Sequence, residues 1–326
     1  MALIDVFENS AFNTFSMAGA IDKVPHQPQM LGNMGVFTPR PIRTEAFAIE
    51  ERNGTLSVIP TSERGGPLNQ RANDKRTVRR FSTVRLAEGD TIRASELANI
   101  RAMGSETELE QVQAEVTRRM AGPTGLRANM ELTWENMRLG AVQGIVTDAD
   151  GSTIINWFSE FGVNQPAEIA FDLDNIAKGD LKIKSNDVIR AMSREANGQM
   201  TPNSRVAALC GDEFYDKLTS LEEVKETFKN LTPQESERLR NQIGLAFDAI
   251  EYGKILWINY RGTDDNSDVA VATDKVKFFP LNAPGVFEVV WSPGEDFESV
   301  GAEGQPLFPM TIPDRDRNQS VSLELY

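Results

Sequence analysis

Hydrophobic residues recur every three or four positions along the middle of the chain, and this spacing places them on one face of an α-helix. The longest such pattern predicts a helix with a single buried stripe, formed by Leu126, Met130, Trp134, Met137, Ala141 and Ile145. Small residues near its end, Gly140 and Gly144, allow another backbone to approach closely. A shorter amphipathic helix is predicted for residues 106–120, where Ser105 can cap the first turn.

Alternation of apolar and polar residues predicts strands before and after these helices. Residues 44–59 and 77–86 alternate on either side of a segment without an apolar pattern, and together they predict a long two-stranded ribbon. An isolated ribbon is marginally stable in water, so this one is expected to lie against a neighbouring surface. Residues 153–161 predict a strand of a hairpin, and residues 321–326 predict a closing strand.

The two ends of the chain differ in pattern. The first forty residues show no periodicity and predict an extended arm, in which residues 10–21 form one short helix and regular structure is interrupted by Pro25, Pro28, Pro39 and Pro41. From residue 187 onward, helical and strand patterns alternate and predict a compact mixed lobe. Helices are expected over residues 188–197, 213–218, 221–228 and 233–243, and strands over residues 206–210, 255–260, 275–279 and 285–291.

Length and composition are those of a globular protein. The chain has 326 residues, of which 40% are hydrophobic, enough for a substantial core divided between two lobes. Its single cysteine, Cys210, follows an apolar run and is expected to be a buried thiol without a disulfide partner. The N-terminus lacks the basic region of a signal peptide, and no apolar run has the length of a membrane span, so no membrane partner is expected.

Charge is unevenly distributed along the chain. The net charge is −14, but residues 36–85 contain ten Lys and Arg against five Asp and Glu, so this segment carries +5 and the remainder carries −14 − 5 = −19. Clustered cations on an acidic protein suit contacts between copies of one chain, because complementary patches steer and align subunits. The residues expected to make such intersubunit contacts are Arg64, Arg71, Lys75, Arg76, Arg79 and Arg80. A solvated surface loop is the alternative interpretation.

The sequence contains few groups that suit catalysis. Its only histidine, His26, lies between prolines in the predicted arm, which argues against Ser-His, Cys-His and zinc sites. The Gly-rich phosphate-binding fingerprints are absent. Asp148 and Asp150 before Gly151 are similar to the start of a calcium loop, but Ser159 stands where the bidentate Glu belongs. A turn is therefore the favoured interpretation of this segment.

Carboxylates remain as the one source of chemistry. Asp264, Asp265 and Asp268 have oxygens that can hold a cation weakly, although acidic loops are usually only solvated. A carboxylate pair for hydrolysis cannot be identified from one sequence, since any Asp and Glu can meet in the fold. A carboxylate-based hydrolase is therefore an alternative without a nominated site. No catalytic residue, metal ligand or cofactor is expected.

The predicted elements follow the order arm, basic ribbon, long helix, hairpin and mixed lobe, and short sequence blocks accompany them. These blocks are Phe37-Thr38-Pro39, Ile49-Glu50-Glu51, Gly54-Thr55-Leu56, Arg64-Gly65-Gly66-Pro67, Arg101-Ala102-Met103-Gly104, Met137-Arg138-Leu139-Gly140-Ala141-Val142-Gln143-Gly144, Asp148-Ala149-Asp150-Gly151, Leu209-Cys210-Gly211-Asp212 and Phe214-Tyr215. Each block is weak alone, but their order and spacing are specific. In these features the chain resembles the lambda-type major capsid protein E family of tailed bacteriophages, which has the HK97-like capsid fold.

The resemblance implies an α+β fold with four parts. Residues 1–43 would form an N-terminal arm, and residues 44–95 an extension loop built on the β-ribbon. Residues 96–186 would form a peripheral domain with the long helix, around residues 127–146, as its spine, and residues 187–326 a mixed α/β axial domain. Part of the C-terminal segment can return to the peripheral domain.

The resemblance also implies a structural function. Copies of the chain would form hexamers and pentamers that close into an icosahedral head around double-stranded DNA, which an acidic protein encloses without sequence-specific binding. The expected location is the virion, after synthesis and assembly in the cytoplasm of a host bacterium. A portal, a scaffold or protease, and a decoration protein would be further partners, and the shell would mature from a procapsid. An encapsulin-type compartment is the alternative with the same fold.

Overall fold

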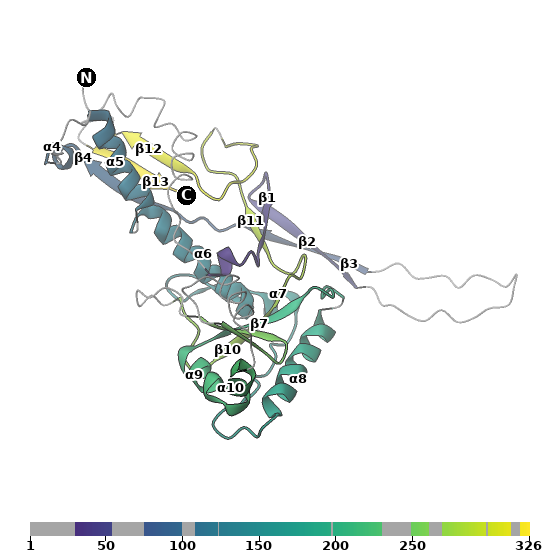
Figure 1. The fold of residues 1–326 in the computed structure, drawn as a ribbon. Helices are drawn as coiled ribbons and strands as arrows, with labels where there is room; N and C mark the ends of the chain where they lie inside the picture. The colour runs from purple at the N-terminus through teal and green to yellow at the C-terminus, as the bar shows by residue number, and fades with distance from the viewer. Residues whose placement is uncertain are drawn as a thin grey trace, which may run out of the picture.

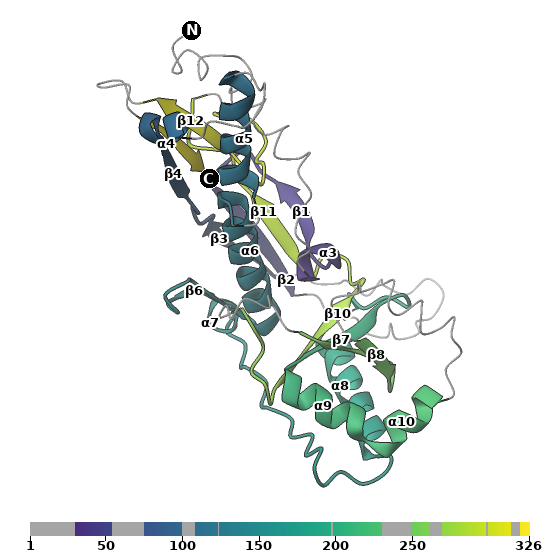
Figure 2. The ribbon, with the colours of Figure 1, turned by 60° about the vertical axis from the view of Figure 1, so that its left-hand side comes forward.

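The computed structural model describes residues 30–53, 75–99, 108–122, 124–196, 198–229, 249–260, 269–297, 299–313 and 320–326. The chain forms two lobes, and the long helix α6 (Leu126–Gln143) runs from one to the other (Figures 1 and 2). A ribbon of β2 (Ala46–Asn53) and β3 (Lys75–Ser82) projects sideways from the region between them (Figure 1). Within the described part of the chain, no helix is both long enough and apolar enough to cross a membrane.

The first lobe, here called the sheet lobe, is a three-stranded antiparallel sheet with helices packed on it. The order is β12 (Pro309–Pro313), β13 (Ser320–Leu325) and β4 (Glu88–Arg93), and the helices are α4 (Ala94–Asn99) and α5 (Glu108–Ala121). Alternate residues of β13, namely Val321, Leu323 and Leu325, are buried, as a strand with one covered face requires. Leu323 and Leu325 meet Val116 and Met120 of α5 in the core. The C-terminal strand thus returns to a strand from the first third of the chain.

Helix α6 ends at Gly144, whose φ of 85° lies in the left-handed region. It therefore ends before Val146, where the prediction placed its last residue. A Cβ built on Gly140 would lie 2.7 Å from the carbonyl oxygen of Ile145, so the returning chain requires a residue without a side chain there. The close backbone approach predicted from the small residues is found between the helix and its own following strand.

The buried stripe predicted for α6 is only partly right. Leu126 and Met130 are buried, but Trp134 and Met137 are only partly buried. The helix crosses between two lobes instead of lying on one surface, so different sides of it are covered along its length. The further buried residues of the helix are Glu131, Glu135, Leu139 and Gly140.

A hairpin of β5 (Ile145–Thr147) and β6 (Thr153–Asn156) follows α6. The strand predicted over residues 153–161 is wrong beyond Asn156, because a short helix, α7 (Trp157–Phe161), begins there. The Asn156 Oδ1 atom accepts hydrogen bonds from the N–H groups of Phe158 and Ser159 at 3.1 and 3.3 Å. This cap stabilises the first turn of a helix, and a pattern of apolar residues alone does not reveal it.

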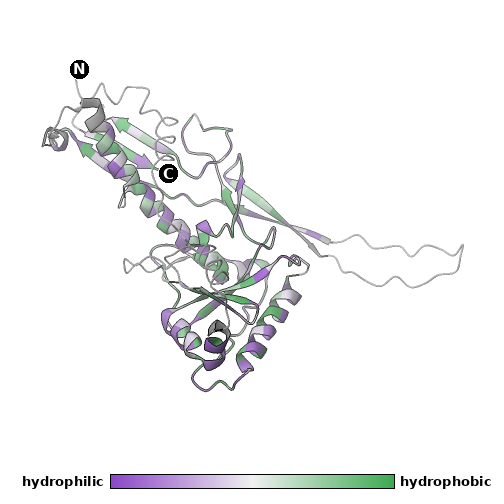
Figure 3. Cartoon of the chain, viewed as in Figure 1, coloured by the Kyte–Doolittle hydropathy of each residue, from purple (hydrophilic) through white to green (hydrophobic). Residues whose placement is uncertain are grey.

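The second lobe, here called the α/β lobe, contains a four-stranded sheet in the order β10-β7-β9-β8. Its elements are α8 (Asp180–Glu195), β7 (Arg205–Cys210), α9 (Asp212–Ser220), α10 (Glu222–Lys229), β8 (Ala249–Tyr252), β9 (Ile255–Asn259) and β10 (Val276–Leu281). The central strands are largely hydrophobic, whereas α8 mixes hydrophobic and hydrophilic residues (Figure 3). Trp257 is fully buried, and its ring centre lies 5.5–6.0 Å from those of Phe171, Phe214 and Phe278.

Most elements predicted for the α/β lobe are found, but the predicted start of α8 is wrong. The helix begins at Asp180 and not at residue 188. The prediction missed the first turns because a polar residue, Ser185, occupies a buried position on the inner face of the helix. The Ser185 hydroxyl donates to the carbonyl of Leu181 at 2.7 Å, and this polar residue interrupts the apolar periodicity. Cys210 is fully buried, as predicted, and burial raises the pKa of its thiol to about 12. The helices predicted over residues 10–21 and 233–243 lie outside the described residues.

The segment before the ribbon contains α3 (Met30–Asn33) and β1 (Thr38–Pro41), and β1 pairs in parallel with β11 (Glu288–Trp291). The expectation that Pro39 and Pro41 interrupt regular structure is therefore wrong. The N–H groups of Thr38 and Ile42 donate to the carbonyls of Phe287 and Trp291 at 3.0 and 2.8 Å. These bonding positions alternate with the prolines, so each missing N–H faces away from β11 and the strand loses no bond to it.

Candidate assembly surfaces

The ribbon has two faces that differ in what they contact. Its strands are antiparallel, with Phe47 opposite Phe81 and Ala48 opposite Arg80. Side chains alternate between the two sides of a strand, so every second pair lies on the same side. The face here called inner carries Phe47, Ile49, Arg79 and Phe81, and the face here called outer carries Ala46, Ala48, Glu50, Arg76, Val78 and Arg80.

The inner face packs on α7 through aromatic rings. Phe81 is buried, and its ring centre lies 5.7 Å from that of Phe47 and 5.3 Å from that of Trp157. Trp157 stacks in turn on Phe161 at 5.8 Å, and the Arg79 guanidinium lies 5.2 Å from the centre of the Phe161 ring, a cation–π contact. These contacts attach the base of the ribbon to α7, the short helix after the β5–β6 hairpin.

The outer face is exposed. Val78 is 59% exposed, and Arg80 is exposed without an ion-pair or hydrogen-bond partner among the residues that the structure describes. Arg76 Nη1 lies 3.4 Å from Glu50 Oε1, and the two side chains keep 62% and 35% of their area in solvent. An exposed pair of this kind contributes about 1 kcal/mol at most. The outer face is therefore available to another molecule.

Two ion pairs hold the chain at the base of the ribbon. Arg43, before β2, pairs with Glu303 at 2.9 Å, and Arg85, after β3, pairs with Glu295 at 2.8 Å. The Arg85 guanidinium also lies 4.7 Å from the centre of the Tyr326 ring. Both glutamates belong to the connection between β11 and β12, so this one acidic connection meets both ends of the ribbon.

The six residues expected to make intersubunit contacts have different surroundings. The structure describes the side chains of three of them, Arg76, Arg79 and Arg80. Arg76 and Arg79 contact Glu50 and Phe161 of their own chain, which leaves Arg80 as the best placed for a partner. Lys75 is the first residue of β3, and the two others, Arg64 and Arg71, lie outside the described residues. The role of the six in intersubunit contacts stays a prediction.

A junction centred on Glu135 of α6 was not foreseen from the sequence. Its buried carboxylate accepts hydrogen bonds from the N–H groups of Leu31 and Gly32 at 2.8 and 3.3 Å, and from the Tyr260 hydroxyl at 3.3 Å. Arg138 Nη1 lies 3.7 Å from the carboxylate and compensates its charge. Burial, and next the charge of Glu135, raise the pKa of Tyr260, so its hydroxyl stays a donor. Glu135 thus joins α3, α6 and the α/β lobe.

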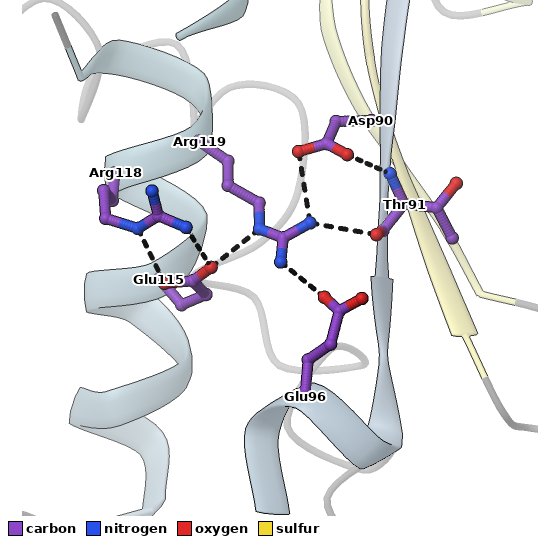
Figure 4. A network of polar contacts seen from close by, with 6 residues as sticks. All are labelled: Asp90, Thr91, Glu96, Glu115, Arg118 and Arg119. Atoms are coloured by element: carbon purple, nitrogen blue, oxygen red, sulfur yellow. Dashed lines mark hydrogen bonds and ion pairs between the residues drawn. The ribbon is translucent and has the colours of Figure 1, made fainter. Parts of the chain in front are cut away.

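Figure 4 shows a charged network that joins three elements of the sheet lobe. Arg119 of α5 donates to Glu115 on its own helix at 2.7 Å and to Glu96 of α4 at 2.5 Å. It also donates to the side chain of Asp90 in β4 at 3.2 Å and to the backbone carbonyl of Thr91 at 2.9 Å. The hydrogen bond from Arg118, opposed by burial, lowers the pKa of Glu115 to about 2. Glu115 therefore stays ionised and keeps both arginines in place.

The acidic segments singled out in the sequence form no metal site where the structure describes them. No group of three or more His, Cys, Asp or Glu side chains in the described ranges is placed to hold a metal ion. Asp148 and Asp150 lie in the turn between β5 and β6, where the Asp150 carboxylate accepts from the N–H of Ser152 at 2.8 Å, so the turn interpretation is confirmed. His26 and residues 261–268 lie outside the described residues.

The comparison with known proteins decides the family. Residues 13–326 match the phage major capsid protein E family. The chain belongs to this family. It is 22% identical to the major capsid protein of Salmonella phage Felix O1 over 347 residues, which cover 98% of this chain and 92% of the relative. It is 26% identical to the major capsid protein of Pseudomonas phage KPP10 over 305 residues, which cover 87% and 84%. A solved chain of the mature capsid of bacteriophage PhiM1 is 12% identical and covers 92% of this chain and 82% of that chain, with a TM-score of 0.45.

Membership in the phage major capsid protein E family confirms the resemblance found in the sequence blocks. It gives the chain a structural role as a major capsid protein, not an enzymatic one, and places it in the virion. The predicted α+β fold class of such capsid subunits is confirmed, with the ribbon, the long helix and the mixed lobe in the expected order. The family gives no support to the hydrolase alternative.

Proposed function

We propose that this chain is the major capsid protein of a tailed bacteriophage or prophage and that its copies form the hexamers and pentamers of an icosahedral head. The observation that carries the proposal is the ribbon, which is attached at its base and exposed along its outer face. A projecting element of this kind places one surface of a copy on a different surface of the next copy. Contacts between unlike surfaces close into rings when the rotation between copies allows it.

The four parts expected from the resemblance remain our proposal for the domains: an arm over residues 1–43, an extension loop over 44–95, a peripheral domain over 96–186 and an axial domain over 187–326. Pairing of β4 with β13 supports a return of the C-terminal segment to the peripheral domain. The same pairing joins residues 88–93 to the C-terminal strand, which supports an earlier end for the extension loop than residue 95.

The proposed cargo is double-stranded DNA, held without sequence-specific contacts. A net charge of −14 supports this, since tight binding of phosphates requires clustered Lys and Arg. The proposed partners are a portal, a scaffold or protease, and a decoration protein, and the proposed site of assembly is the cytoplasm of the host bacterium. Expansion of a procapsid would turn the ribbon relative to α6. Such a rotation would change the aromatic contacts between Phe81 and α7.

The test is negative-stain electron microscopy of the protein, expressed alone and together with the genes that flank it. We expect rings or closed shells, and flanking genes for a portal, a protease and a small decoration protein. Monodisperse monomers under both conditions would overturn the proposal. Particles that contain an enzyme in place of DNA would favour the encapsulin-type compartment instead.

A further inference from the structure

The connection between β11 and β12 exposes two large apolar side chains. Phe297 is 99% exposed and Val300 is 76% exposed, although the backbone around them is fixed by the buried Ser299. The N–H of Ser299 donates to the Asp296 Oδ1 atom at 2.8 Å and to the Asp296 carbonyl at 3.2 Å. An exposed aromatic side chain with a second exposed apolar residue three positions away suits a contact with another molecule, because aromatic residues are enriched in protein interfaces.

The same connection is closely packed at both of its ends. A Cβ built on Gly294 would lie 2.8 Å from the ring of Phe308, and one built on Gly304 would lie 2.0 Å from the carbonyl oxygen of Trp291. Neither position has room for a side chain, so the two ends of the connection are packed against each other and against the end of β11, and the N–H of Gly304 also donates to the carbonyl of Ile42 at 2.9 Å. We call that middle part, comprising Glu295, Asp296, Phe297, Ser299 and Val300, the knob.

The knob lies in an acidic environment. Residues 293–304 contain four Asp and Glu and no Lys or Arg. Two of the carboxylates pair with basic residues at the base of the chain's own ribbon, Glu295 with Arg85 and Glu303 with Arg43. The connection therefore already recognises arginines of the ribbon segment, while the apolar tips of the knob stay uncovered.

The outer face of the ribbon has the complementary composition. It presents Ala48 and Val78 beside Arg76, which pairs with Glu50, and beside Arg80, which is exposed and has no partner of its own within the described ranges. The ribbon projects away from the body of its own chain, so its outer face can be reached by a second copy (Figure 1). The outer face therefore offers apolar side chains beside an arginine, and the knob offers apolar side chains beside carboxylates. Protein interfaces commonly have this arrangement, with an apolar centre and complementary charges at the rim.

We infer that the knob of one copy receives the outer face of the ribbon of a second copy, with Phe297 and Val300 against Val78 and the carboxylates around Arg80. This inference rests on the proposed function and names the surface that the ribbon reaches. One connection then holds the base of its own ribbon through Arg43 and Arg85 and the outer face of the neighbouring ribbon through the knob. It thereby sets the spacing between successive subunits of a ring.

The test is a disulfide between two singly substituted chains, one carrying Val78→Cys with an affinity tag and the other carrying Val300→Cys without one. Both positions are exposed, so neither substitution disturbs the core, and the native Cys210 is buried and does not interfere. The two chains are co-assembled, oxidised, and separated on a non-reducing gel. We expect a covalent heterodimer that only an intermolecular contact can produce. The matched control replaces Val300→Cys with Ile183→Cys, which is 57% exposed on α8 of the other lobe.

Phe297→Ala in both chains supplies the second measurement. If the Phe297 ring anchors the contact, its loss should reduce the yield of heterodimer roughly tenfold, as a loss of about 1.4 kcal/mol in association would do. Normal shells with no more heterodimer than the Ile183→Cys control would overturn the inference and leave the proposed function standing. If the unsubstituted chain forms no shells at all, the proposed function fails, and the inference that rests on it fails too.

Discussion

At the centre of the α/β lobe Trp257 is fully buried among aromatic rings, whereas in the ribbon Phe81 alone is buried among the residues whose side chains are described. Strand β7 is buried from Val206 to Cys210, while β3 has exposed residues along most of its length. A lobe with this core keeps its fold by itself, since burial of large apolar side chains is the main stabilising term. The ribbon instead depends on α7 at its base and on another molecule along its outer face.

The junctions between these regions use a third means, which is buried charge. Glu135 connects α3 and the α/β lobe to α6, and Arg119 connects three elements of the sheet lobe. Charged groups that are buried with all their partners fix a geometry more than they add net stability. The removal of one partner is nevertheless strongly destabilising, because the remaining groups lose their hydrogen bonds without regaining water. Substitutions in the core of the α/β lobe, at the buried charges and on the ribbon should therefore differ in their effects on stability and assembly.

The largest effect on folding is expected from Trp257→Ala in the α/β lobe. The substitution removes contacts with Phe171, Phe214 and Phe278 and leaves a cavity, so the unassembled subunit should lose about 3–5 kcal/mol of unfolding free energy. Urea unfolding followed by circular dichroism measures this loss. Phe297→Ala is the matched control, and its fully exposed ring should change the free energy by about 0.5 kcal/mol or less. Equal losses for the two variants would contradict the view that this lobe has a self-sufficient core.

The next largest effect is expected from Glu135→Ala at the junction with α3. The change removes the acceptor of the N–H groups of Leu31 and Gly32 and one ion-pair contact of Arg138, and should cost about 3 kcal/mol. Glu135→Gln keeps one acceptor oxygen and should cost less. Hydrogen exchange adds a local readout, because the Leu31 amide should exchange faster in the Ala variant. An unchanged exchange rate there would show that Glu135 does not hold α3 in place.

A smaller effect that depends on pH is expected from Glu115→Gln in the sheet lobe. The folded pKa of about 2 lies below the usual 4.5, so the stabilisation by ionised Glu115 is complete above about pH 4.5 and is lost as the pH falls toward 2. The variant should be less stable than the parent protein by about 2 kcal/mol at pH 7, with the difference narrowing between pH 4.5 and pH 2. Denaturant midpoints over this range provide the measurement. Asp187→Asn, in an exposed pair with Arg190, is the control, and a difference at Glu115 that does not vary with pH would refute its role.

The smallest effect on stability, and the largest effect on assembly, is expected from Arg80→Ala on the outer face of the ribbon. Because Arg80 is exposed, its loss should change the unfolding free energy by about 0.5 kcal/mol or less. The fraction of protein that sediments as shells should fall. The matched control is Arg194→Ala, which removes an exposed arginine from α8 of the other lobe, and this variant should assemble normally. If both variants assemble alike, the ribbon does not use Arg80 to bind a neighbour.

Local periodicity explains which parts of the fold could be predicted. Strand β7 is buried over most of its length, and β13 and α5 bury residues along one side, so these elements show a regular pattern in the sequence. The ribbon shows a weaker alternation, in which only the side that packs on α7 is covered. The predictions fail where one polar residue decides the local structure. Asn156 ends a strand by capping α7. Ser185 is a polar residue at a buried position, and it interrupts the apolar periodicity by which the first turns of α8 would be predicted.

The sequence by itself determined the class of the protein, because residues 13–326 match the phage major capsid protein E family. It also determined that cations cluster in residues 36–85. Only the tertiary structure decided which of them are free, and which carboxylates are buried. Glu135 and Leu31 are 104 positions apart, and a glutamate on a helix has the same pattern in the sequence whether water or another segment covers it. Burial of a charge depends on segments that are distant in the chain, and local periodicity contains no information about them.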